Sequence, residues 1–126
     1  MTADIQGAID RWLNALHAMG QDAFVSAACA EDAVVERYGW DGERRPSEVF
    51  EGHQAIGEWL ARSPEGTRFH AGEATLDDEV WVVPYTVTLQ DFRNHGTWRV
   101  TLDDAGLVRE LQHRPQPLPP PDIPLP

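Results

Sequence analysis

The stretch at residues 81–90, WVVPYTVTLQ, alternates apolar side chains with a second set at a period of two. This period predicts a β-strand with one apolar face, formed by Trp81, Val83, Tyr85, Val87 and Leu89. Pro84 has no N–H to donate to a strand ladder, so we expect a sheet edge or a bulge at this residue.

The alternation continues toward the C-terminal end. A hairpin turn is predicted at residues 93–96, and the strand after it continues the apolar face with Trp98, Val100 and Leu102. A tight turn at residues 103–106 leads into a last strand at residues 107–113. On that strand we expect one side to carry Leu107, Leu111 and His113, and the other Val108, Glu110 and Gln112. The second half of the chain is therefore predicted to be an antiparallel meander.

The first half shows helical spacing instead. A first helix, capped by Thr2 with Asp4 in its first turn and ended by Gly20, is predicted from Ile5, Ile9, Trp12, Leu13, Leu16 and Met19. A second helix at residues 22–30 should bury Phe24, Val25 and Ala28, and Glu31 and Asp32 should end it before a strand at residues 33–38. A polar loop leads to a third helix that begins at Gly52 and carries Ile56, Trp59 and Leu60.

Composition narrows the class of protein. The 126 residues favour one domain, predicted at residues 1–114. A net charge of -11, with no lysine, argues against nucleic acid and against an anionic membrane surface as partners. The absence of a long apolar run, with the single cysteine Cys29, leads us to expect a cytoplasmic protein without disulfides.

The last twelve residues, 115–126, contain seven prolines. This composition predicts an extended polyproline II tail that lies along the surface or in solvent. The other reading of the same residues is a ligand for a proline-recognition module.

The order of the elements, helices first and a strand meander last, is typical of an α+β fold. Three segments, AEDAVVE at residues 30–36, FEGHQAI at residues 50–56 and VTLDDAGLV at residues 100–108, resemble the nuclear transport factor 2-like superfamily, and within it the SnoaL-like and ketosteroid-isomerase-like branch. The resemblance covers residues 4–114. It implies a cone-shaped, curved, antiparallel or mixed sheet of the cystatin-like kind, covered by three helices from the N-terminal half, with a pocket between them.

The resemblance also implies positions for catalytic groups. The general-base aspartate of the isomerase branch falls on Arg37, its tyrosine donor near Leu13 and its second acidic donor near Trp98. A guanidinium cannot accept a proton at neutral pH, and neither leucine nor tryptophan is an oxyanion-stabilising acid. We therefore do not expect isomerisation by that mechanism.

Three other roles are open. Strand alternation places Arg37 on the same face as Val35, which the resemblance implies is the pocket face. There it would bind an anion or, in the other reading, extend to the pocket rim or pair with Glu48 or Glu51. His113 and Tyr85 are candidates for proton transfer. The other readings are a half-exposed histidine at the end of the sheet and a core tyrosine with a local partner. Apolar ligand contacts are predicted from Trp12, Leu13, Trp59, Leu60, Val83 and Trp98. Solvent exposure is the expectation for His17, His53 and His95, and the face of His70 stays open.

These residues favour a SnoaL-like protein whose pocket binds a small hydrophobic molecule. Hydrophobic anions are among the ligands we expect. Its activity would be that of an isomerase, cyclase or dehydratase without metal or cofactor. The alternative is a non-catalytic binding or dimerisation module whose cone is filled by tryptophans. The resemblance also implies a homodimer through the outer sheet face, where Val82, Thr86, Thr88, Arg99 and Thr101 form a mixed surface.

Overall fold

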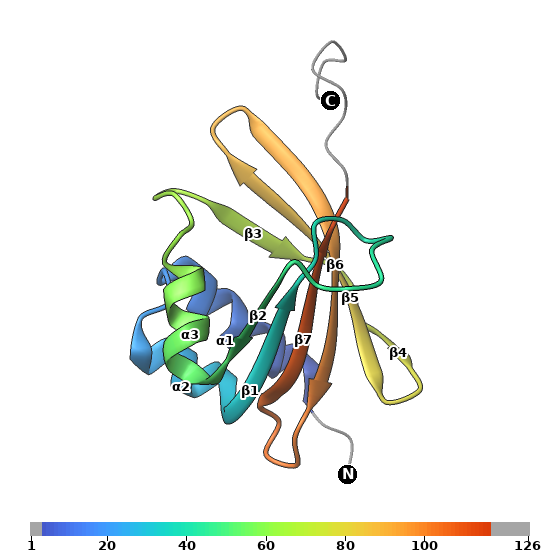
Figure 1. Ribbon diagram of the computed structural model, residues 1–126. Coiled ribbons are helices and arrows are strands. Elements are labelled where there is room, and N and C mark those ends of the chain that lie inside the picture. The colour runs from blue at the N-terminus through green and yellow to red at the C-terminus, as the bar shows by residue number, and fades with distance from the viewer. Residues whose placement is uncertain (1–3, 117–126) are drawn as a thin grey trace.

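One mixed sheet organises the chain, and Figure 1 shows the helices packed together against one side of it. The computed structural model describes residues 4–116. Its strands are β1 (Cys29–Arg37), β2 (Glu48–Glu51), β3 (Arg68–Ala71), β4 (Thr75–Asp77), β5 (Val80–Leu89), β6 (Phe92–Leu102) and β7 (Val108–Pro115). They lie in the order β2-β1-β7-β6-β5-β3, with β4 also paired to β5. Among the strands of residues 4–116, β1 and β7 are the one pair that runs parallel. The α+β cone expected from the sequence is confirmed.

The helices are α1 (Ile5–His17), α2 (Asp22–Ala28) and α3 (Gly52–Leu60). Helix α1 buries a stripe formed by Ala8, Ile9, Trp12, Ala15 and Leu16. Its N-cap is Asp4, whose side chain accepts a hydrogen bond from the Gly7 N–H, so Asp4 precedes the helix instead of lying in its first turn. Thr2 lies outside the described residues.

The second helix is shorter than its sequence predicts. Val25 and Ala28 are buried, but Phe24 points outward and is 40% exposed. Cys29 and Ala30 already belong to β1, and the predicted break at Glu31 and Asp32 is an irregularity within that strand, where the β1–β7 register shifts. Strand β1 continues past this bulge, because its pairing with β7 resumes at Val34 and Glu110.

The predicted hairpin turn at residues 93–96 is wrong. These residues lie in β6, and the chain turns at Gln90, which takes a left-handed φ of 53°, and Asp91. Gly96 serves packing instead of turning. A Cβ at this position would lie 2.6 Å from the Tyr85 hydroxyl and 2.5 Å from the Arg114 carbonyl.

The predicted faces of the last strand also need correction. Val108 and Leu111 are both buried, each only 1% exposed. The β6–β7 register shifts between Thr101 and Leu102, which pair with Glu110 and Val108. This extra residue puts two side chains three positions apart on the same face, which strict alternation does not allow. Leu107 packs only partly against the core.

Pro84 lies in an interior strand, yet its missing N–H leaves no gap in a ladder. On that side of β5, pairing with β3 begins at Tyr85 and pairing with β4 ends at Val82. The side of β5 facing this interruption is therefore a local edge at Pro84, where the Pro84 carbonyl accepts the Gly72 N–H at 2.7 Å.

At the C-terminal end, β7 continues to Pro115, and the Gln116 N–H donates to the His95 carbonyl at 2.9 Å. The first two residues of the predicted tail thus extend the sheet. The conformation predicted for the rest of the tail falls on residues 117–126, outside the described part of the chain.

Replacing Gly96 by alanine should destabilise the protein by about 1–3 kcal/mol, because the added methyl group meets backbone atoms that cannot move aside. Urea unfolding measures this change in the free energy of unfolding. Arg93→Ala, an exposed position on the same strand, should change it by less than about 0.5 kcal/mol. Equal effects of the two substitutions would contradict the packing role of Gly96.

Candidate functional site

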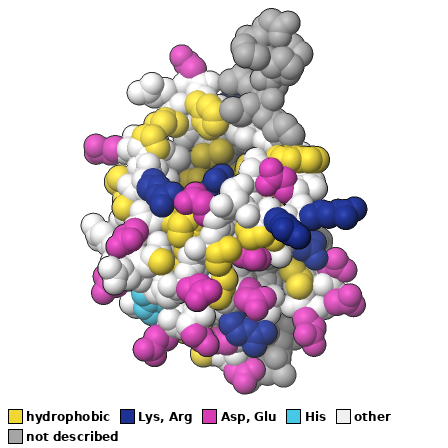
Figure 2. Space-filling view, viewed as in Figure 1, with side chains coloured by type: hydrophobic (Ala, Val, Ile, Leu, Met, Phe, Trp, Pro, Cys, Tyr) yellow, Lys and Arg dark blue, Asp and Glu magenta, His cyan; other side chains and the backbone are white. Residues whose placement is uncertain are grey.

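The wide end of the cone holds a pocket of about 220 Å³. Figure 2 shows a hollow on this face, with apolar side chains around it and basic and acidic side chains near its rim. The pocket, called the mouth pocket below, is lined by Leu16, Arg37, Trp59, Leu60, Arg62, Ser63, Phe69 and His113. Its wall combines apolar and aromatic groups with two guanidinium groups, and it has no carboxylate among these lining residues.

Strand pairing brings Arg37 to the pocket. Arg37 is the last residue of β1, and it pairs with His113 of β7 on one side and with Glu48 of β2 on the other. Val35, two residues earlier on the same face, is fully buried. Alternation therefore placed Arg37 correctly on the inner face, at the point where that face opens.

An acidic side chain holds the two arginines together. Arg37 Nε donates to Glu48 Oε1 at 2.9 Å, and Arg62 Nη1 donates to Glu48 Oε2 at 3.0 Å. The hydrogen bonds from Arg62, and then those from Arg37, hold the pKa of Glu48 below its usual range. The Arg62 guanidinium also lies over the Phe50 ring, 5.5 Å from its centroid.

Only one nitrogen of Arg37 is used in this contact. Among the described residues, its two terminal Nη groups have no hydrogen-bond partner, and its side chain is 34% exposed. The pairing with Glu48 that the sequence left open is therefore present, while N–H donors of Arg37 remain available at the mouth pocket.

His113 is held by two aromatic side chains. Trp98 Nε1 lies 3.0 Å from His113 Nδ1, and the Tyr85 hydroxyl lies 3.3 Å from His113 Nε2. An indole N–H only donates, so Nδ1 must carry a lone pair. The hydrogen of the neutral ring is then on Nε2, which donates to the Tyr85 oxygen.

The surroundings of His113 favour this neutral form. Burial, and secondarily the charge of Arg37, lowers the pKa of His113 to about 4. Its ring also packs edge to face against Trp59 and stacks on Tyr85. At neutral pH neither ring nitrogen offers a free lone pair, which a general base requires.

Tyr85 stands behind His113 and is not among the residues that line the mouth pocket. It is 3% exposed and stacks on Trp98 with ring centroids 4.6 Å apart. Burial, and then the negative charge of Asp41, raises the pKa of its hydroxyl group. Tyr85 is therefore a neutral phenol that accepts a hydrogen bond from His113.

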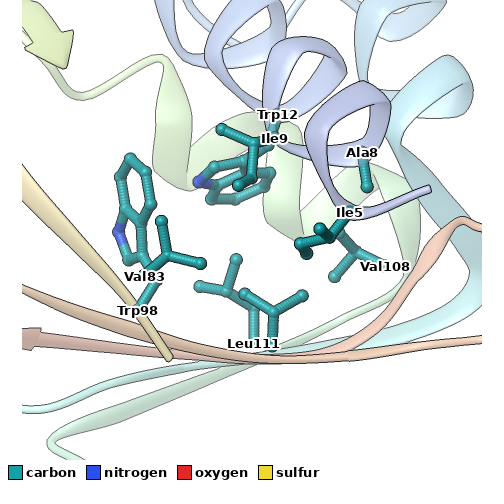
Figure 3. Close-up of a pocket in the computed structure, with 9 residues that line it drawn as sticks. Ile5, Ala8, Ile9, Trp12, Val83, Trp98, Val108 and Leu111 are labelled. Atoms are coloured by element: carbon teal, nitrogen blue, oxygen red, sulfur yellow. The ribbon is translucent and has the colours of Figure 1, made fainter. Parts of the chain in front are cut away.

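The narrow end of the cone is almost filled. Figure 3 shows Trp12 from α1 and Trp98 from β6 beside the small cavity that remains there. The volume is about 10 Å³, no more than one water molecule needs. Trp12 and Trp98 meet edge to face at 6.3 Å, and Val83 completes the wall. Filling by tryptophans, one of the two sequence interpretations, thus describes this end of the cone.

The predicted ligand-contact residues separate into three places. Trp59 and Leu60 line the mouth pocket, whereas Trp12, Val83 and Trp98 line the small inner cavity. Leu13 lies in an open groove between α1 and β3. Sequence reasoning missed Leu16, Arg62, Ser63 and Phe69 as lining residues. For Arg62 a signal existed, because it follows Trp59 by three residues, close to one helical turn.

Two histidines expected in solvent make internal contacts. His17 Nε2 accepts the Phe69 N–H at 3.0 Å, which ties α1 to β3, and burial lowers its pKa. His53 Nε2 lies 2.8 Å from the Cys29 carbonyl oxygen. His70 and His95 are exposed on the outer face.

Within residues 4–116, no cluster of three or more histidine, cysteine or acidic side chains could hold a metal ion. No helix in this part of the chain is long and apolar enough to cross a membrane.

Comparison with known proteins identifies the fold. No family model and no curated protein matches the sequence. Solved structures do match, among them a protein assigned as a ketosteroid isomerase from Kribbella flavida, with a TM-score of 0.71, 21% identity, and coverage of 94% of this chain and 86% of that one.

An assigned SnoaL-like isomerase from Agrobacterium tumefaciens gives a TM-score of 0.69 at 18% identity, covering 90% of this chain and 97% of that one. A nuclear transport factor 2-like protein of unknown function from Mesorhizobium loti gives 0.64 at 18%, covering 90% and 91%. The chain has the nuclear transport factor 2-like fold, as its sequence motifs indicated.

The low pKa of His113 makes stability depend on pH. Because the unfolded chain binds the proton more readily, stability should fall as the pH drops from about 6.5 toward 4, by up to about 3 kcal/mol. His113→Gln, whose amide can accept from Trp98 and donate to Tyr85, should remove this part of the pH dependence. Urea unfolding at several pH values measures it.

His95→Gln, at an exposed position on β6, is the matched control and should leave the wild-type pH dependence unchanged. If His113→Gln lost as much stability on acidification as the wild type does, His113 would not carry the effect.

Proposed function

We propose that the protein binds a small aromatic or otherwise apolar carboxylic acid in the mouth pocket. The observation that carries this proposal is Arg37, whose terminal Nη groups lack a protein partner among the described residues beside an aromatic wall. A guanidinium presents a planar fork that matches the two oxygens of a carboxylate. Trp59 and Phe69 would contact the apolar part of the ligand.

The size of the pocket limits the ligand. Drug-sized ligands occupy pockets of roughly 300–1,000 Å³, and the mouth pocket has about 220 Å³. Because Trp12 and Trp98 fill the cone behind it, a ligand cannot extend inward without moving them. A single-ring compound fits these dimensions better than a fused-ring one.

A second candidate function is acid–base catalysis without a cofactor, in the manner of the assigned isomerases that share the fold. The observation in its favour is the contact of His113 with Tyr85 at the back of the pocket. The hydrogen-bond directions argue for binding instead, because His113 is a donor toward Tyr85 and an acceptor toward Trp98. In this proposal the pair shapes the pocket, and no proton is removed from the ligand.

Arg37→Ala should weaken the binding of an aryl carboxylate such as benzoate by about 1.5–3 kcal/mol, the usual value of a hydrogen bond to a charged group. Benzamide, which has the same ring but no charge, should lose much less. Titration calorimetry on wild type and variant measures both affinities. Equal benzoate affinity in the two proteins would refute the proposed role of Arg37.

We further propose a homodimer through the outer sheet face. Thr86 is exposed there, and Val82, Thr88 and Thr101 are only partly covered. Charged side chains lie between these residues: Arg99, which contacts Asp77, pairs with Val82, and Arg68 and Arg93 flank Thr88. Sedimentation at micromolar concentration should show a species of twice the chain mass of 14.1 kDa. A monomer alone would exclude this interface.

A further inference from the structure

The charges at the mouth pocket do not balance. Two guanidinium groups, of Arg37 and Arg62, share the single carboxylate of Glu48. His113 adds no charge, because the indole N–H of Trp98 points at its Nδ1 and leaves no room for a second hydrogen there. The residues at this site therefore carry one net positive charge on a chain whose net charge is -11.

We propose that Glu48 is a specificity-determining residue, which reduces the advantage that dianions such as phosphate monoesters would otherwise have over monoanions such as carboxylates in the mouth pocket. This inference rests on the proposed function, because it concerns which anion the same pocket accepts. A monoanion would neutralise the site. A dianion would bring a second negative charge close to the Glu48 carboxylate, where like charges repel.

The position of Glu48 supports this role over a purely structural one. It lies on β2, directly paired with Arg37 of β1, and its oxygens contact both arginines at 2.9 and 3.0 Å. It thus orients the guanidinium of Arg37 through Nε and at the same time cancels half of the positive charge. Orientation and charge are separable, because glutamine keeps an oxygen that accepts from Nε but carries no charge.

The distinguishing result is how the gain in affinity caused by Glu48→Gln depends on the charge of the ligand. Removing the Glu48 charge stabilises a bound dianion about twice as much, in free energy, as a bound monoanion, since Coulomb energy is proportional to charge. If Glu48→Gln raises benzoate affinity about threefold, phenyl phosphate affinity should rise about ninefold, because a doubled free energy squares the factor. Benzamide affinity should stay unchanged.

The experiment is titration calorimetry of benzoate, phenyl phosphate and benzamide at about pH 8, where phenyl phosphate is a dianion, and at moderate salt. Glu51→Gln is the matched control: it removes a charge from the same strand, but at an exposed position opposite Val34 on the other face, and it should change neither affinity.

Arg62→Gln tests the same idea in the opposite direction and does not depend on how Glu48→Gln folds. It should weaken phenyl phosphate about twice as much in free energy as benzoate. Equal gains for the two anions in Glu48→Gln, or an equal effect of Glu51→Gln, would overturn the role of Glu48. If neither wild type nor Glu48→Gln bound any of the anions, the proposed function itself would fail.

Discussion

The hydrogen bond from Trp98 to His113 is the interaction on which the rest of the cone depends. It joins β6 to β7 on the inner face, and it fixes which nitrogen of His113 carries the hydrogen. Through Nε2 the same ring holds Tyr85, and Trp98 packs against Trp12. This hydrogen bond thus holds Trp98 in the narrow end of the cone, where it packs against Trp12, and keeps the uncharged ring of His113 beside Arg37. The mouth pocket lies beyond this buried group, and His113 forms part of its wall.

The sequence predicts the elements well wherever one period holds along them. The stripe of α1 and the alternation of β5 place Trp12, Val83 and Tyr85 inside, as observed. Prediction fails where the role of a residue depends on a contact with a residue far away in the sequence. Gly96 resembles a turn residue because glycine is common in turns, but here a side chain is excluded by the Arg114 carbonyl and the Tyr85 hydroxyl. Val108 faces inward only because of a bulge.

The sequence predicts several residues of the site, but it predicts fewer of the contacts between them. Strand alternation identifies Arg37 and His113 as inward-facing, and Glu48 was one of two partners considered. That His113 would be held by Trp98 and Tyr85 depends on the pairing register of β5, β6 and β7, which periodicity does not specify. Phe69 was missed because β3 has four residues, too few for a reliable period.

The interruption opposite Pro84 separates the sheet margin into two units that can open independently. All three residues of β4 are exposed, they make three pairs with β5, and the further polar contact of β4 within the described residues is that of Asp77 with Arg99 at 3.5 Å. Strand β3 is also tied to α1 by the Phe69–His17 hydrogen bond. In the folded protein we therefore expect local opening to begin at β4 and to stop at the interruption, because β4 pairs with β5 and not with β3. The wall of the mouth pocket, to which β3 contributes Phe69, should therefore keep its shape when β4 opens.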